Sequence, residues 1–140
     1  MRIVVTISRY LLGIVFLVFG LNGFFHFIPQ PPPTGLALQF FIAVSSSHFM
    51  VAVFGVQVIA GVLLLLNRYV PLALTLLAAM LFNILNFHIT MAPAGIGLAL
   101  FVTALWFVVA VSVRSAFASI LQPRMESEYA RVQSRRAVEA

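Results

Sequence analysis

The stretch that decides the fold reads GVLLLLNRYVPLALTLLAAM and covers residues 61–80. Two apolar runs meet here around a single charged residue, Arg68. Outward from this point, no Asp, Glu, Lys or Arg occurs between Tyr10 and Asn67 or between Tyr69 and Val113. A soluble domain of this size needs a charged shell, whereas a bilayer needs about 20 apolar residues for each helical crossing. The pattern therefore predicts an integral membrane protein.

The whole chain has the composition of a membrane protein. Of its 140 residues, 63% are apolar and 8% are charged, and the mean hydropathy is +1.13, outside the usual range for soluble domains. The first uncharged run holds two crossings and a loop, and the second holds two crossings and a tight turn. We predict an all-α membrane protein, a four-transmembrane-helix bundle forming one domain over residues 1–121, followed by a polar cytoplasmic tail at 122–140.

Proline and asparagine residues mark the helix boundaries. Pro29 ends the first helix because proline lacks the amide hydrogen that continues one, and Pro71 suits the first turn of the third. Ser45 to Ser47 offer N-cap hydroxyls for the second helix, and Asn67 is a typical helix stop. The predicted helices cover about residues 9–28, 48–67, 71–91 and 95–118.

A short apolar segment lies between the first two predicted helices. Residues 36–44 contain one polar residue, Gln39, and are too few to cross a bilayer. Such a segment is too apolar for open water. We therefore expect a short interfacial helix, or a segment that dips back against the bundle.

The arginines predict the orientation, since short loops rich in Lys and Arg stay on the cytoplasmic side. Four crossings put every arginine on one side and leave the other two loops uncharged, so we expect both termini in the cytoplasm. The apolar stretch after Arg9 is too long for a secretory signal, and we expect it to stay attached. The formal charge of +5 is then a topology signal and not a nucleic-acid footprint, although anionic lipid binding by the tail is an alternative. The arginines are Arg2, Arg9, Arg68, Arg114, Arg124, Arg131, Arg135 and Arg136.

The chain contains no cysteine. It therefore forms no disulfide, thiolate metal site or thiol relay, which excludes four-helix disulfide oxidases that couple to quinone and reductases of the vitamin K type.

Any chemistry must come from the few polar side chains inside the membrane, because burying them in hydrocarbon is costly. The three histidines all fall near the predicted outer boundary, where they suit interfacial anchors or structural hydrogen bonds first, contacts to a quinone second, and haem or metal ligands third. Interhelical hydrogen bonding is the main alternative for the amides. The candidate ligand-binding residues are Asn22, His26, Asn83, Asn86 and His88, with His48 and Gln57 as secondary candidates and no metal site assigned.

Three phrases resemble the DoxX family of small four-helix membrane proteins over about residues 8–118. They are RYLLGIVFLVFGLNGFFHFIP at residues 9–29, GVLLLLNR at 61–68 and FNILNFH at 82–88. The resemblance implies a four-helix bundle in a bacterial inner membrane and a link to quinone-coupled thiosulfate oxidation or membrane oxidoreductase assemblies. Many relatives carry a glutamate where this chain has Gln57. This chain departs from the family here, and because an amide does not titrate, a proton-transfer role that rests on that glutamate does not carry over to Gln57.

Three functions follow from these observations. The preferred one is an accessory or structural subunit of a larger membrane complex, linked to redox or quinone chemistry and without catalytic activity of its own. The second is a quinone- or haem-binding oxidoreductase component, with quinone favoured over haem. The third is a transporter of a small or lipid-like solute. In each case we expect the lipid bilayer and other membrane subunits, or further copies of the chain, as partners.

Overall fold

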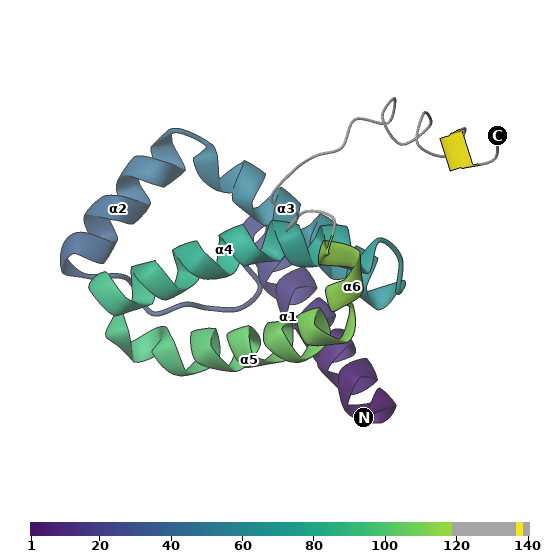
Figure 1. Cartoon of the computed structure of the whole chain (residues 1–140). Helices are drawn as coiled ribbons and strands as arrows, with labels where there is room; N and C mark the ends of the chain where they lie inside the picture. Colours follow the sequence, from purple (N-terminus) through teal and green to yellow (C-terminus); the bar gives the residue numbers. More distant parts are fainter. Residues whose placement is uncertain (119–136, 139–140) are drawn as a thin grey trace.

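The computed structural model describes residues 1–118 and 137–138, and the regular secondary structure of this part of the chain is all helical (Figure 1). The predicted tail lies outside the described residues, apart from Ala137 and Val138. The elements are α1 (Arg2–Phe25), α2 (Gly35–Ser46), α3 (Phe49–Leu65), α4 (Val70–Thr90), the 3-10 turn η1 (Pro93–Gly95), α5 (Ile96–Ser112) and α6 (Arg114–Phe117).

Among the described residues, three stretches of helix are long and apolar enough to cross a membrane: α1, α4, and η1 together with α5, at 24, 21 and 20 residues. A fourth candidate span is the bent pair α2 and α3, because α3 has 17 residues and passes the same test only together with α2. These two helices meet at 88°. The predicted all-α, multi-pass membrane fold is therefore confirmed, with α2 as the short extra helix between the first two spans.

Close contact between α1 and α3 forms the centre of the bundle. A Cβ added to Gly61 would lie 2.8 Å from the Leu17 nitrogen and 2.9 Å from the Gly13 oxygen, so the two backbones touch there. Small residues at a crossing allow this approach in membrane helices. The buried core then extends from α1 and α3 through α4 to α5 and includes Leu12, Phe16, Ala60, Leu64, Leu74, Leu77 and Val109.

The first helix differs from its predicted bounds at both ends. It begins at Arg2, before the predicted start at Arg9. Arg9 itself lies inside the helix, with 8% of its surface exposed. It ends at Phe25 because His26 adopts left-handed backbone angles, with φ 53° and ψ 36°. The backbone N–H of His26 donates to the backbone carbonyl of Asn22 at 2.8 Å. Left-handed residues of this kind commonly close helices.

The serine cluster ends α2 and does not cap the next helix as predicted. The hydroxyls of Ser46 and Ser47 donate to the carbonyls of Ala43 and Val44 at 3.0 and 3.1 Å. The chain then turns at His48, φ 58°, before α3 begins.

The last span is shorter than predicted. It stops at Ser112, and Val113 separates it from α6. The Ser112 hydroxyl donates to the Val109 carbonyl at 2.6 Å, a local bond that competes with helix continuation.

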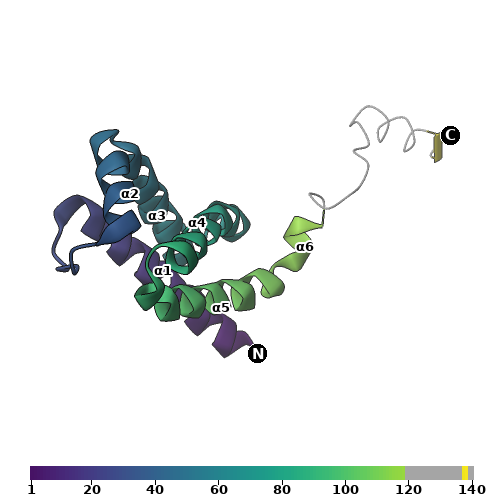
Figure 2. The same cartoon turned by 90° about the vertical axis from the view of Figure 1, so that its left-hand side faces the viewer.

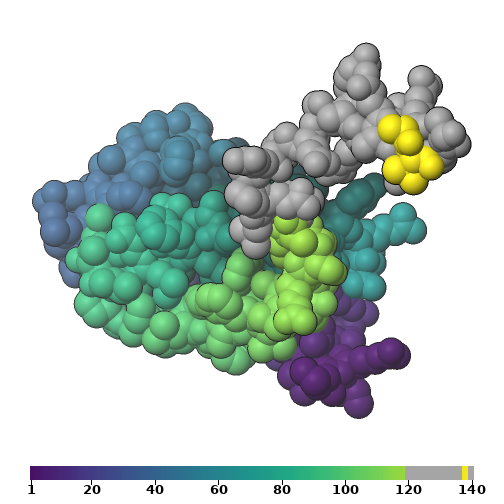
Figure 3. All heavy atoms as spheres, in the orientation of Figure 1, coloured from purple at the N-terminus to yellow at the C-terminus, as the bar shows by residue number. Residues whose placement is uncertain are grey.

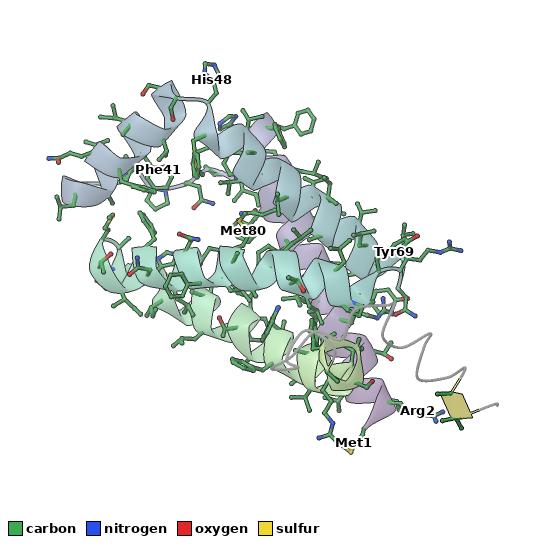
Figure 4. The ribbon with its side chains drawn as sticks, turned by 45° about the horizontal axis from the view of Figure 1, so that its top comes forward. Met1, Arg2, Phe41, His48, Tyr69 and Met80 are labelled. Carbon is green, nitrogen blue, oxygen red and sulfur yellow. The ribbon has the colours of Figure 1, made fainter. Side chains whose placement is uncertain are left out.

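The turns and short helices lie at two opposite ends of the helix bundle. The N-terminus, the turn between α3 and α4, and α6 lie at one end, whereas α2 and η1 lie at the other (Figure 1). Figure 2 faces this second end and shows α2 beside α3. Figure 4 likewise separates His48 and Phe41 from Met1, Arg2 and Tyr69. Arg2, Arg68 and Arg114 therefore share one end of the molecule, since each belongs to one of the elements gathered there.

Candidate functional site

The candidate residues divide into groups by burial. Asn22 and Gln57 are buried, each with 8% of its surface exposed. His88 is half-buried, and the other candidates, His26, His48, Asn83 and Asn86, are exposed. The structure therefore does not gather them in one enclosed pocket.

Asn22 closes the turn that follows α1. Its Oδ1 accepts the Ile28 N–H at 2.5 Å, and its Nδ2 donates to the Ile28 carbonyl at 3.4 Å. A side-chain amide that pairs with a backbone amide in this way replaces the partners that the helix end lacks. Both functional groups of Asn22 are thus used to hold the segment leading to Pro29.

His88 closes the turn between α4 and α5. Its Nδ1 lies 2.9 Å from the Ala92 oxygen. A Cβ on Gly95 would come within 2.1 Å of the His88 ring, so glycine is needed where the chain passes the imidazole. The hydrogen bond and the close backbone fix His88 in a structural position.

An aromatic cluster joins α2 to the end of α4. The rings of Phe40 and Phe41 lie 5.6 and 5.4 Å from that of Phe87, and the Phe87 ring lies 5.3 Å from that of His88. These are the separations of stacked and edge-to-face pairs. In the space-filling view, the atoms of α2 accordingly adjoin those of α4 (Figure 3).

Gln57 lies at the contact of α3 with α1. A Cβ on Gly20 would be 3.0 Å from the Gln57 Cβ. Within the described part of the chain, the Gln57 side chain makes no hydrogen bond of its own. No buried side-chain nitrogen or oxygen of the described residues lacks a hydrogen-bond partner, so the Gln57 amide keeps some exposed surface although the residue as a whole is 8% exposed.

Asn83 and Asn86 are on the outer surface of α4. Asn83 Nδ2 donates to the Ala79 carbonyl of its own helix at 2.8 Å. At 100° per residue, both asparagines project away from the buried Leu74 and Leu77. They do not face the bundle interior with Asn22 and Gln57, because the core side of α4 is filled by leucine and alanine.

Arg9 and Trp106 have structural roles that the sequence analysis missed. Arg9 Nη1 donates to the Leu64 carbonyl and, at 3.5 Å, to the Leu65 carbonyl at the end of α3. Its guanidinium also lies 4.4 Å from the centre of the Tyr10 ring. Trp106 Nε1 donates to the Leu74 carbonyl at 2.9 Å. For Arg9, the sequence did contain a sign of this role: an arginine next to an apolar helical stretch needs a partner for its charge.

No protein-family model, curated protein or solved structure matches this chain. Among the described residues, no three His, Cys, Asp or Glu side chains come together in a group that could hold a metal ion. The arrangement of the polar side chains is therefore the main guide to function.

The two buried residues Asn22 and Gln57 make a matched pair for mutagenesis. Asn22→Leu should lower stability by about 1–3 kcal/mol, because it leaves the Ile28 N–H and carbonyl without their partner. Gln57→Met should leave stability unchanged or raise it, because no bond to the described residues is lost. Thermal unfolding of the purified variants in one detergent measures both, and equal loss in the two would contradict the assignment.

Proposed function

We propose that this chain is an accessory, non-catalytic subunit of a larger membrane assembly. The observation that carries the proposal is the position of Asn83 and Asn86 on the exposed side of a membrane-spanning helix. Asn83 Nδ2 donates to the Ala79 carbonyl, but Asn83 Oδ1 and the Asn86 side-chain amide bond to none of the described residues, and polar side chains in membranes usually face protein. The surface of the single chain is thus incomplete without a neighbour.

The other spans provide an internal comparison. Exposed side chains of α1 from Ile7 onward, of α3, and of α5 up to Val111 are apolar or aromatic. Those surfaces suit lipid directly. The middle of α4 differs from them within the described residues, which points to α4 as the side where another helix packs.

The engaged polar residues also support a structural role. Asn22 and His88 bond to the backbone of their own turns. The fold thus occupies two of the residues that a quinone or haem site would need.

The resemblance to the DoxX family in residues 9–29, 61–68 and 82–88 supports a quinone-linked redox assembly in a bacterial inner membrane. The common end of Arg2, Arg68 and Arg114 supports a cytoplasmic position for both termini. In this arrangement His26, His48 and His88 belong to the opposite side of the membrane, because they lie in or beside the turns that follow α1, α2 and α4.

Gentle extraction of the tagged chain from its native membrane tests the proposal. We expect other polypeptides to co-purify at fixed stoichiometry, without haem absorption or stoichiometric quinone on this chain. A variant with Asn83→Leu and Asn86→Leu should fold and insert but elute as a smaller assembly, because it loses its neighbour at α4, whereas Ala104→Leu on the exposed side of α5 should elute like the parent chain. Recovery of the wild-type chain without other polypeptides, or with a stoichiometric cofactor bound to it, would contradict the proposal.

A further inference from the structure

The exposed side of α4 carries a continuous line of small and polar residues, here named the α4 polar face. At 100° per residue its members fall within about 80° of one another. They lie opposite the buried Ala73, Leu74, Leu77 and Leu81. The α4 polar face consists of Thr75, Ala79, Asn83, Asn86 and Thr90, all exposed.

Hydrogen bonds within α4 satisfy only part of this face. The hydroxyls of Thr75 and Thr90 donate to the carbonyls of Pro71 and Asn86 at 2.9 and 2.7 Å. The Asn83 amide nitrogen is engaged with Ala79, but its Oδ1 accepts no bond from the described residues. The Asn86 amide makes none at all within that same part of the chain. Both asparagines therefore keep donors and acceptors that none of the described residues satisfies.

An α4 helix that crosses the bilayer along its length places both asparagines in the hydrocarbon core, where water is absent. With a rise of about 1.5 Å per residue, Asn83 is about 4.5 Å and Asn86 about 9 Å beyond Met80 at the centre of α4. The hydrocarbon core extends about 15 Å to each side of the bilayer centre. If α4 crosses along its length, only another protein helix can satisfy these amides.

We propose that the α4 polar face packs against the same face of a second copy of this chain, about a two-fold axis along the membrane normal. This inference rests on the proposed function, because it names the neighbour that covers α4. Two copies inserted with one topology present parallel α4 helices, so each residue on the axis meets its equivalent at the same depth.

The side chains on this face are self-complementary. An asparagine amide is both donor and acceptor, so Asn83 of one copy can donate to and accept from Asn83 of the other, and Asn86 can do the same. Asparagine pairs of this kind fix register in parallel helix dimers. Ala79 is small enough to let the two backbones approach one turn before Asn83.

Cysteine cross-linking in membranes tests the contact directly, because the chain has no native cysteine. Ala79→Cys is placed on the α4 polar face, and Ala104→Cys is the control at an exposed alanine in the middle of α5. Copper phenanthroline oxidises two thiols to a disulfide only where their Cβ atoms come within about 4.5 Å. We expect a homodimer from Ala79→Cys and little from Ala104→Cys, with both variants eluting like the parent protein.

Adding Asn83→Leu and Asn86→Leu to Ala79→Cys should weaken association roughly tenfold, if each amide pair contributes the average for membrane helices. Equal cross-linking at positions 79 and 104, no cross-link at 79, or an unchanged dimer after the leucine substitutions would overturn the inference. Linkage of position 79 to a different polypeptide would overturn the second copy as occupant while leaving the proposed subunit function standing.

Discussion

Replacing Arg9 with methionine should destabilise the bundle by about 2 kcal/mol, the range expected for losing a hydrogen bond to a charged group. The guanidinium is 8% exposed and donates to the Leu64 and Leu65 carbonyls. These carbonyls are at the C-terminal end of α3, where a cation also stabilises the helix dipole. Methionine fills similar space but donates no hydrogen bond, so the Leu64 and Leu65 carbonyls lose their partner. The thermal unfolding midpoint in detergent measures the effect.

Two arginine variants separate this contact from the general effect of charge. Arg9→Lys should lose less than Arg9→Met, because an ammonium can still donate to one carbonyl but lacks the planar fork of donors. Arg2→Met removes the same formal charge from an exposed position on the same helix and should change the midpoint little. Equal midpoints for the Arg2 and Arg9 methionine variants would show that the bond to α3 contributes nothing.

Arg9 illustrates what hydropathy can and cannot predict. From hydropathy alone, the charge of Arg9 predicts the start of the first span and a cytoplasmic position for that end of the helix. Hydropathy averages over a window and does not encode which neighbour a side chain reaches. The bond from Arg9 to Leu64 joins residues 55 positions apart in the chain, so it depends on how α1 packs against α3.

The helices themselves were predictable because each is an apolar run bounded by proline, asparagine or charge. Turns were less so. His26, His48, Asn67 and Tyr69 all have positive φ, yet of these only Asn67 belongs to a residue type that commonly marks a helix end. The left-handed angles of the two histidines and Tyr69 follow from the path between packed helices and not from their own preferences.

The candidate site was predictable in part from angles along α4. Asn83 and Asn86 differ by about 60° on a helical wheel, and His88 lies about 140° from Asn83. In agreement with these angles, both asparagines are exposed whereas His88 turns toward Ala92. A helical wheel gives relative directions only. The burial of Leu74 and Leu77 fixes which side of α4 faces the core.

Gly61→Leu should disrupt the bundle more than any substitution on its lipid-facing surface. The new Cβ alone would lie 2.8 Å from the Leu17 nitrogen and 2.9 Å from the Gly13 oxygen, which are backbone atoms of α1 that cannot rotate away. Overpacking of this kind typically costs about 1–3 kcal/mol, and more when backbone must move. We expect low yield of folded protein and an early unfolding midpoint, measured by size-exclusion chromatography after heating.

Gly55 on the same helix is the matched control. A Cβ added there meets no atom within 4 Å, so Gly55→Ala adds helix propensity without a clash and should stabilise α3 by about 0.5–1 kcal/mol. Opposite signs at positions 55 and 61 would show that the α1 and α3 backbones touch at Gly61 and that glycine is retained for that contact. Wild-type stability in Gly61→Leu would instead mean that α1 and α3 can separate at this point without cost. The Arg9 bond at the end of α3, set by the same α1 and α3 register, would then need another explanation.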